Sequence, residues 1–455
     1  MSASSLPPVA IVGGGPAGLT LARILQRHHV VCRVYESEPA ATARNQGGSL
    51  DLHAESGLWA VEQCGLIEQF RAHSRPDDDC MRILDKTGRV HWDEDETPRP
   101  TGPPDAADHT RPEIDRLILR NMLLEAVEAA DSNTMQWGHA LASIYPLPAA
   151  STAATDDEQP TMWQLTFKNG TTVDAAIVIG ADGAWSRIRP LLSSAKPTYT
   201  GITFVDLTVP HFSAHPQLAA VLRHGSALVL GDGRGILPQM NGNDTLRVYA
   251  AVRESEQWLD EPSGGAFLAS GGPAAVDELI KRYYDGWYEP ALEMLRSADM
   301  ASLMARRIYA LPSDHRFEHT AQTRLVTAVG DAAHLMSPFA GEGVNLAMLD
   351  AAQLALAIAA VLSPTPPPAT TTTTSSSSAA SESVVERLAA AIASFERGMF
   401  ERSQEAAEES ARNLELIFSK DGTGASAIAG MMQSMMSMMA AGGGHGHEGR
   451  VDLHE

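Results

Sequence analysis

A run of glycines near the start of the chain has the spacing of a phosphate-binding turn. Residues 13–18 read GGGPAG and fit G-x-G-x-x-G with Gly13, Gly15 and Gly18 at the fixed positions. Between a strand and a helix, the first glycine permits a tight turn, the second lets backbone approach a pyrophosphate, and the third lets the helix pack on the strand. Glu36 follows about 20 residues downstream, where a carboxylate can accept hydrogen bonds from a ribose. The motif predicts a dinucleotide site and leaves FAD and NAD as alternatives.

A second motif, GDAAHLMSPFAGEGVN at 330–345, favours FAD. Asp331 follows an apolar run at 325–329 that predicts a buried strand. From the end of that strand, the Asp331 carboxylate can reach a ribityl hydroxyl. A long apolar helix is predicted to begin near Gly341, and its positive end would stabilise the negative charge that a reduced flavin carries on its N1–C2=O edge. We therefore assign Gly341 and Gly343 to the cofactor site together with Asp331.

The elements that must position these motifs alternate as in a parallel sheet. Apolar runs at 9–12 and 30–35 flank a helical pattern, which is the order of a βαβ unit. Two further runs, at 175–179 and 325–329, have the continuous apolar character of buried strands. From about residue 201 to residue 310 the pattern changes to short β-rich segments separated by Gly, Asn and Asp, which indicates a second domain inserted within the first.

We therefore predict an α/β fold with a Rossmann-like FAD-binding domain, an inserted β-sheet-rich substrate domain and a long C-terminal helix. The predicted FAD-binding domain is discontinuous and comprises residues 1–75, 105–195 and 321–362. The predicted substrate domain comprises residues 76–104 and 196–320. Residues 363–383 are of low complexity and are expected to be a flexible insertion before a helix at 384–420. Residues 421–455 are expected to form a disordered tail.

Composition limits the partners of the chain. It has 34 Lys+Arg and 56 Asp+Glu, and the resulting formal charge of -22 opposes binding to nucleic acid and to anionic lipid. Its three cysteines have neither disulfide nor zinc-site spacing, so we expect no metal. The sequence shows no leader of basic and apolar residues and no uninterrupted apolar run of spanning length. We expect a soluble cytoplasmic monomer without stable membrane association.

Three motifs together resemble the single-component FAD-dependent monooxygenases of the aromatic-hydroxylase class (group A). They are GGGPAGL at 13–19, ADGAWSRIR at 181–189 and the motif at 330–345. Within this class, RNQGGSLDLH at 44–53 and RPEIDRLILRNML at 111–123 look closest to the tetracycline-inactivating flavin monooxygenases. The resemblance spans roughly residues 8–420 and implies the aromatic-hydroxylase-like fold.

The resemblance implies roles for individual residues in cofactor binding. FAD would be contacted at its adenosine ribose by Glu36, at its ribityl or pyrophosphate part by Asp331, and also by Asp51 and Arg116. Arg44 would contribute to contact with the nicotinamide cofactor and to flavin mobility. Asp182 would serve FAD and NAD(P)H binding together.

The resemblance also implies substrate contacts, but not the identity of the substrate. Positions that approximately correspond to drug-contacting residues of the tetracycline-inactivating enzymes hold Asp206, Leu237 and Arg247, whose side-chain chemistry differs. Pro338 and Phe339 fit the pattern beside the flavin. The reaction class is therefore implied more strongly than tetracycline as substrate.

The implied reaction is oxygen transfer to a small aromatic or polycyclic compound, in secondary metabolism or xenobiotic inactivation. NAD(P)H would reduce FAD, and O2 would add to form a flavin C4a-hydroperoxide. Hydroxylation, epoxidation and Baeyer–Villiger insertion are not separated by the sequence. A flavoprotein oxidase or dehydrogenase without oxygen insertion, and a flavin-binding protein without catalysis, are the alternatives. No general base is identified, and His334 has a structural and a catalytic interpretation.

Overall fold

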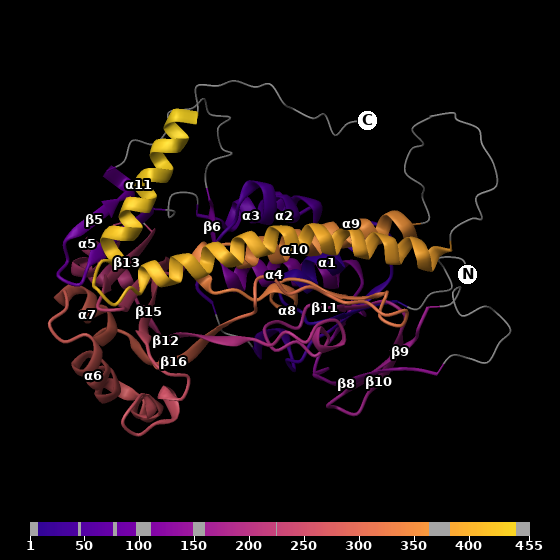
Figure 1. Ribbon diagram of the computed structural model, residues 1–455, viewed down its shortest axis with the longest axis horizontal. Coiled ribbons are helices and arrows are strands. Elements are labelled where there is room, and N and C mark those ends of the chain that lie inside the picture. The colour runs from indigo at the N-terminus through magenta and orange to yellow at the C-terminus, as the bar shows by residue number, and fades with distance from the viewer. Residues whose placement is uncertain are drawn as a thin grey trace.

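A computed structural model describes residues 8–43, 47–75, 80–96, 111–148, 160–223, 225–363 and 383–442 (Figure 1). Arg44 lies outside the described residues, as do most of the low-complexity stretch and the end of the predicted tail. The mixed α/β fold of the prediction is confirmed: a parallel sheet with helices on one side carries the glycine motifs, and a larger, mostly antiparallel sheet lies beside it.

The first sheet is parallel throughout and has the order β17-β11-β1-β2-β7. Its strands are β1 (Val9–Val12), β2 (Cys32–Tyr35), β7 (Met135–Gln136), β11 (Val178–Gly180) and β17 (Val326–Ala328). Side chains alternate along a strand, so Val9 and Ile11 pack into one core and Ala10 and Val12 into another. Strands β1, β11 and β17 are short and buried at every position, as the continuous apolar runs predict.

The two faces of this sheet are covered differently. On one face lie helices α1 (Pro16–Arg27), α4 (Arg116–Ala130) and α9 (Gly343–Leu362). On the other lies a small antiparallel sheet of β8 (Leu141–Pro146), β9 (Trp163–Phe167) and β10 (Thr172–Ala175). Shorter elements, α2 (Trp59–Gln63), α3 (Ile67–His73) and a π-helical turn at Ala54–Leu58, complete the helical face.

More than half of the residues of helix α9 are buried. It packs against α1 and against α10 (Val384–Ile417), which runs along the length of the molecule (Figure 1). Among the described residues α9 alone is long and apolar enough to cross a membrane, although 61% of its most apolar stretch is buried within the protein. Helix α10 begins with a capping box: the backbone N–H of Glu386 donates to the Ser383 hydroxyl, and the N–H of Ser383 donates to the Glu386 carboxylate.

The second sheet has seven strands in the order β16-β12-β15-β14-β13-β4-β5. They are β16 (Asp299–Ala310), β12 (Thr198–Pro210), β15 (Thr245–Arg253), β14 (Arg234–Asn241), β13 (Gly225–Gly231), β4 (Cys80–Asp85) and β5 (Val90–Asp93). One face packs on α5 (Pro216–Leu222), α6 (Gly272–Tyr283) and α7 (Glu289–Arg296). We call the opposite face, which carries Phe204, Leu237 and Tyr249, the inner face.

The inner face meets the first sheet's domain at two places. Phe204 contacts Phe339 of η10 (Pro338–Ala340), with ring centroids 5.9 Å apart. The Gln239 side chain donates to the Ser49 carbonyl at the start of β3 (Ser49–Asp51), which pairs with β6 (Glu113–Asp115). The motif predicted to bind flavin therefore adjoins a face of the second sheet.

The predicted disordered tail is wrong for residues 424–442, which form helix α11 (Gly424–Gly442). Helix α11 packs against β4, β5 and β13 and lies at the same end of the molecule as the second sheet (Figure 1). Its side chains Ile428, Met432 and Met436 are spaced by four residues and join the apolar cluster of the inner face. The Met run therefore supplies a helical apolar stripe, and the part of the predicted tail after residue 442 lies outside the described chain.

Substitution within α11 tests this packing. We expect Met432→Asp to lower stability by about 1–3 kcal/mol, because it brings a charge into apolar contacts. The matched control is Gln433→Asp, which introduces the same charge at an exposed position of the same helix. Thermal unfolding of both variants checks the prediction, and equal melting temperatures would contradict the packing of α11.

Candidate cofactor and substrate site

The turn between β1 and α1 has the geometry expected of a phosphate site. Gly13 has φ +110°, and a side chain there would collide with the Ala181 carbonyl, while one at Gly18 would collide with the Gly13 carbonyl. Gly15 differs, because no atom lies within 4 Å of the place a Cβ would take. No side chain caps the N-terminus of α1 at Gly15. The free N–H groups and the open space above Gly15 fit a pyrophosphate.

Glu36 lies at the end of β2 beside this turn, where the sequence motif predicts it. The backbone N–H of Gly14 donates to Oε2 at 2.6 Å, and the Ser37 hydroxyl and the Glu38 N–H donate to Oε1, each at 2.9 Å. The carboxylate is buried and is held against the glycine turn. That position suits hydrogen bonds to a ribose whose phosphates lie over Gly15.

The N-terminus of α9 is the second open helix end. The helix predicted to begin near Gly341 begins at Gly343, because Gly341 is left-handed, with φ +72°, and cannot be part of the helix. No side chain caps this end, and a Cβ at Gly343 would have no neighbour within 4 Å. At Gly330, by contrast, a Cβ would lie 2.8 Å from the Cβ of Ala347, so β17 and α9 approach each other closely.

Asp331 opens the short helix α8 (Asp331–His334) and is exposed. The cap of α8 is Gly330, whose carbonyl accepts from the N–H groups of Ala333 and His334, and the Asp331 side chain accepts no hydrogen bond from any described residue. Desolvation by the surrounding protein atoms raises the pKa of Asp331, although the charges of His334 and Arg116 act to lower it. A carboxylate that stabilises no turn is available to a ligand.

Asp182 provides a further free oxygen near α8. Its Oδ2 accepts from the N–H of Arg187 at 2.7 Å, whereas Oδ1 is buried and has no partner in the described chain. Burial raises the pKa of Asp182, and hydrogen bonds from Ser186 and the Arg187 backbone offset part of this effect. Arg189 donates to the carbonyl of Ala332 at 3.0 Å and so ties this segment to α8. The orphaned Oδ1 fits a polar ligand.

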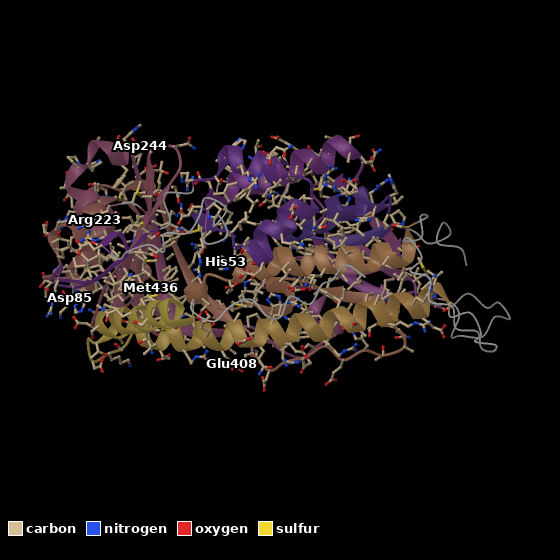
Figure 2. All side chains as sticks on the ribbon, turned by 90° about the horizontal axis from the view of Figure 1, so that it is seen from above. His53, Asp85, Arg223, Asp244, Glu408 and Met436 are labelled. Atoms are coloured by element: carbon tan, nitrogen blue, oxygen red, sulfur yellow. The ribbon has the colours of Figure 1, made fainter. Side chains whose placement is uncertain are left out.

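A buried histidine that the sequence analysis did not single out links β3 to α9. His53 Nε2 lies 3.1 Å from Asp51 Oδ2, and its Nδ1 lies 3.3 Å from Glu342 Oε1. The Asn345 side chain accepts from the N–H of His53 at 2.9 Å and donates to the Asp51 carbonyl at 3.0 Å. Figure 2 shows His53 between the two halves of the molecule. The group fixes Asp51 beside the N-terminus of α9.

This group is charged at neutral pH. Burial alone would lower the pKa of His53, but hydrogen bonds to Asp51 and Glu342, together with their charges, raise it to about 9. Burial likewise acts to raise the pKa of Asp51, yet the hydrogen bond from His53 and its charge leave it lowered. An imidazolium therefore lies between two carboxylates at the mouth of α9.

The predicted substrate contacts lie together on the inner face. Asp206, Tyr249 and Leu237 are directly opposite one another on β12, β15 and β14, so they form one row across the sheet. Asp206 is fully buried and bonds Arg247, with Nε at 2.5 Å from Oδ1 and Nη2 at 2.6 Å from Oδ2. Arg306 of β16 also donates to Oδ2 at 2.6 Å. Sequence reasoning missed Arg306 and Tyr249, because no local motif marks either residue.

The aromatic residues beside this row connect it to the cofactor motif. Phe339 contacts both Phe204 and Phe418, with ring centroids 5.9 and 5.2 Å apart, and Pro338 beside it is exposed. Arg116 begins α4 next to Gly47, where a Cβ would lie 3.0 Å from the Cβ of Arg116. Phe339 thus links the motif at 330–345 to the row of predicted substrate contacts on the inner face.

His334 has a structural environment. Its Nε2 lies 2.5 Å from Oδ2 of the buried Asp350, and Arg402 of α10 donates to Asp350 Oδ1 at 3.3 Å. Burial alone would lower the pKa of His334, but the charge and hydrogen bond of Asp350 raise it. The pair joins α8, α9 and α10 below the site. Within the described residues, no group of three or more His, Cys, Asp or Glu side chains is arranged to hold a metal ion.

Comparison with known proteins identifies the class. The chain matches the FAD binding domain family over residues 7–264 and 289–388, which make up most of its length. It is 31% identical over 454 residues to monooxygenase asqM of Emericella nidulans, covering 90% of this chain and 96% of that protein. The chain therefore belongs to the FAD binding domain family and is an FAD-dependent monooxygenase.

Two further relatives refine the comparison. The 3-amino-4-hydroxybenzoate 2-monooxygenase PtmB3 of Streptomyces platensis is 27% identical over 366 residues, which cover 79% of this chain and 82% of that protein. The crystal structure of tetracycline destructase Tet(51) has a TM-score of 0.63 at 15% identity, covering 98% of this chain and all of that one. At that identity Tet(51) shows a shared fold, which agrees with the class recognised from the motifs.

Removal of the Asp331 charge tests its place in the cofactor site. We expect Asp331→Asn to weaken FAD binding about 10- to 100-fold, because a hydrogen bond to a charged group contributes about 1.5–3 kcal/mol. Asp314→Asn, at an exposed carboxylate in the loop between β16 and β17, is the control. FAD titration of the apoprotein gives the dissociation constants. An unchanged constant with a lower melting temperature would show that Asp331 is only structural.

The His53 group makes stability depend on alkaline pH. Because the pKa of His53 rises from 6.5 to about 9 on folding, its stabilisation is fully present below pH 6.5 and is lost as pH rises through 9. We expect the melting temperature of the unaltered protein to fall between pH 7 and 9.5, and that of His53→Asn to fall less. Glu342→Gln should shift the fall to lower pH, since one carboxylate remains. Parallel curves for all three proteins would contradict this assignment.

Proposed function

We propose that this monooxygenase uses NAD(P)H and O2 to hydroxylate a small aromatic or polycyclic compound bound between the N-terminus of α9 and the inner face. The observation that carries the proposal is the contact of Phe339 with Phe204. This contact joins the motif at 330–345, which contains the uncapped N-terminus of α9, to a sheet face rich in aromatic side chains. A flat substrate can therefore lie against apolar surface and close to the cofactor.

The chain's own groups suit the parts of FAD. The N-terminus of α1 and the open space at Gly15 would hold the pyrophosphate, and Glu36 would hold the adenosine ribose. Asp331 would accept hydrogen bonds from the ribityl chain, with Asp182 nearby. The positive end of α9 would stabilise negative charge on the reduced ring system.

When bound, FAD would take two electrons from NAD(P)H and activate O2, so that one oxygen atom enters the substrate and the other leaves as water. The residues of the chain position the substrate and exclude water. Phe204, Phe339 and Phe418 form a continuous aromatic wall beside the substrate region. Exclusion of water by this wall favours transfer of oxygen to the substrate over release of hydrogen peroxide.

The curated relatives support a small organic substrate. The name of PtmB3 gives 3-amino-4-hydroxybenzoate as its substrate, which is an electron-rich aromatic ring. We propose the same broad class here, with a role in secondary metabolism or xenobiotic inactivation. Epoxidation and Baeyer–Villiger insertion remain variants of the proposal, and an oxidase or dehydrogenase without oxygen insertion is the second candidate.

Oxygen labelling separates these candidates. The purified holoprotein is screened for compounds that stimulate NADPH or NADH oxidation, across phenols, aromatic acids, quinones and tetracyclines. With ¹⁸O2, we expect one labelled oxygen atom per product molecule. The control reaction combines ¹⁶O2 with H2¹⁸O and should give unlabelled product. Oxidised product without label, accompanied by hydrogen peroxide, would identify an oxidase in place of a monooxygenase.

A further inference from the structure

We propose that Arg306, held in place by Asp206, binds an anionic oxygen of the substrate: the carboxylate, or the ionised phenol or enol oxygen, of an aromatic acid. This inference rests on the proposed function, because it places the substrate on the inner face. It goes further by naming the chemical class of the substrate and the side chain that selects it.

The hydrogen bonds around Asp206 leave Arg306 as the arginine with donors to spare. Arg247 donates from Nη2 to Asp206 Oδ2 and from Nη1 to the Thr208 hydroxyl, at 3.0 Å, and its Nε lies 2.5 Å from Asp206 Oδ1 as an ion pair. Arg306 bonds Asp206 through Nη2, and no described residue accepts a hydrogen bond from its Nε or Nη1. Its side chain is 45% exposed, against 13% for Arg247. Arg306 can therefore bind an added oxygen without breaking an existing bond.

The charges in this cluster do not balance. Asp206 supplies one negative charge and is fully buried, while Arg247 and Arg306 supply two positive charges. Asp206 and Arg247 already form a two-point ion pair with no net charge. Arg306 therefore carries a surplus positive charge. A substrate that covered this charge with apolar surface would incur the cost of removing it from water, whereas an anionic substrate would compensate it.

The neighbours of Arg306 fit an aromatic ring attached to that anion. Arg306 lies directly opposite Phe204 on the adjacent strand, and Tyr249 lies 5.4 Å from Phe204 between ring centroids. Phe204 in turn contacts Phe339 of the flavin motif. A ring against Phe204 would place its acidic group toward Arg306 and its other edge toward the N-terminus of α9. The cluster thus fixes which end of the substrate faces the cofactor.

Tyr249 lies in the same electrostatic environment. Burial and the charge of Asp206 raise the pKa of its phenol, while Arg247, Arg306 and Arg116 act to lower it. The Tyr249 side chain therefore stays uncharged at neutral pH and does not supply the missing negative charge. The titratable and charged groups that face Tyr249 from the sheet are Asp206 and the two arginines, and Arg116 faces it from α4.

Matched ligands and matched arginines test the inference. The ligands are a panel of hydroxybenzoates, including 3-amino-4-hydroxybenzoate, each paired with its uncharged carboxamide. The variants are Arg306→Gln and Arg306→Lys. The control is Arg307→Gln, which removes an arginine from the next position of β16, where the side chain bonds the Glu256 carbonyl and Asp260 on the other side of the strand. Dissociation constants come from the change in flavin absorbance of the holoprotein.

We expect at least one acid to bind more tightly than its carboxamide. Arg306→Gln should weaken binding of that acid about 10- to 100-fold and raise its KM more than it lowers kcat, with little effect on the carboxamide. Arg306→Lys should recover part of the affinity, and Arg307→Gln should leave it unchanged. Equal binding of acids and amides, an unchanged preference in Arg306→Gln, or no binding by any acid would each overturn the inference.

Oxygen labelling distinguishes failure of the role of Arg306 from failure of the proposed monooxygenase function. If uncharged compounds acquire ¹⁸O from O2 while acids are not preferred, the monooxygenase proposal stands and the role of Arg306 fails. If acids bind through Arg306 but no compound acquires label, the binding role stands and oxygen insertion fails. A lower melting temperature for Arg306→Gln with unchanged acid binding would show that Arg306 only neutralises Asp206.

Discussion

The site depends on one constraint: α9 must be buried while its first turn stays open. The helix packs between α1 and α10. A Cβ at Gly330 would collide with the Cβ of Ala347, so glycine at this position lets the chain after β17 lie close to α9. Two polar residues in α9 are satisfied by specific partners: Asn345 by the backbone of β3, and Asp350 by His334 and Arg402. Buried polar groups without such partners would destabilise the helix. Because these partners fix α9 along its length, its open N-terminus has one position relative to the first sheet.

Glycine patterns were predicted well because their requirements are local. Gly13, Gly15 and Gly18 lie in one turn, so their spacing alone reports the tight bend, the open space and the close packing that the structure shows. Continuous apolar runs also identified the strands of the parallel sheet, since both faces of that sheet are buried. The class of enzyme followed from the resemblance of three motifs, at 13–19, 181–189 and 330–345, to the aromatic-hydroxylase class.

Contacts between distant segments could not be predicted in this way. His53 and Glu342 are separated by most of the chain, and their ion pair depends on how β3 docks against α9. Arg306 meets Asp206 only through the antiparallel register of β12 and β16, and a shift of one residue would turn Arg306 to the opposite face. Helix α11 was missed for another reason. Its Met-rich stripe becomes an ordered helix because the inner face offers it apolar surface, whereas the sequence alone shows a low-complexity end.

The charge cluster on the inner face contrasts with the acidic character of the chain. A formal charge of -22 repels anions at long range, but salt screens that repulsion over about 10 Å, so the local surplus at Arg306 governs close contacts. Asp206 makes this surplus useful. It holds the guanidinium in one orientation before a ligand arrives, so less side-chain freedom is lost on binding than for an unrestrained arginine. One carboxylate shared by two arginines thus leaves a single, oriented positive charge beside an aromatic wall, which is the arrangement that an aromatic anion complements.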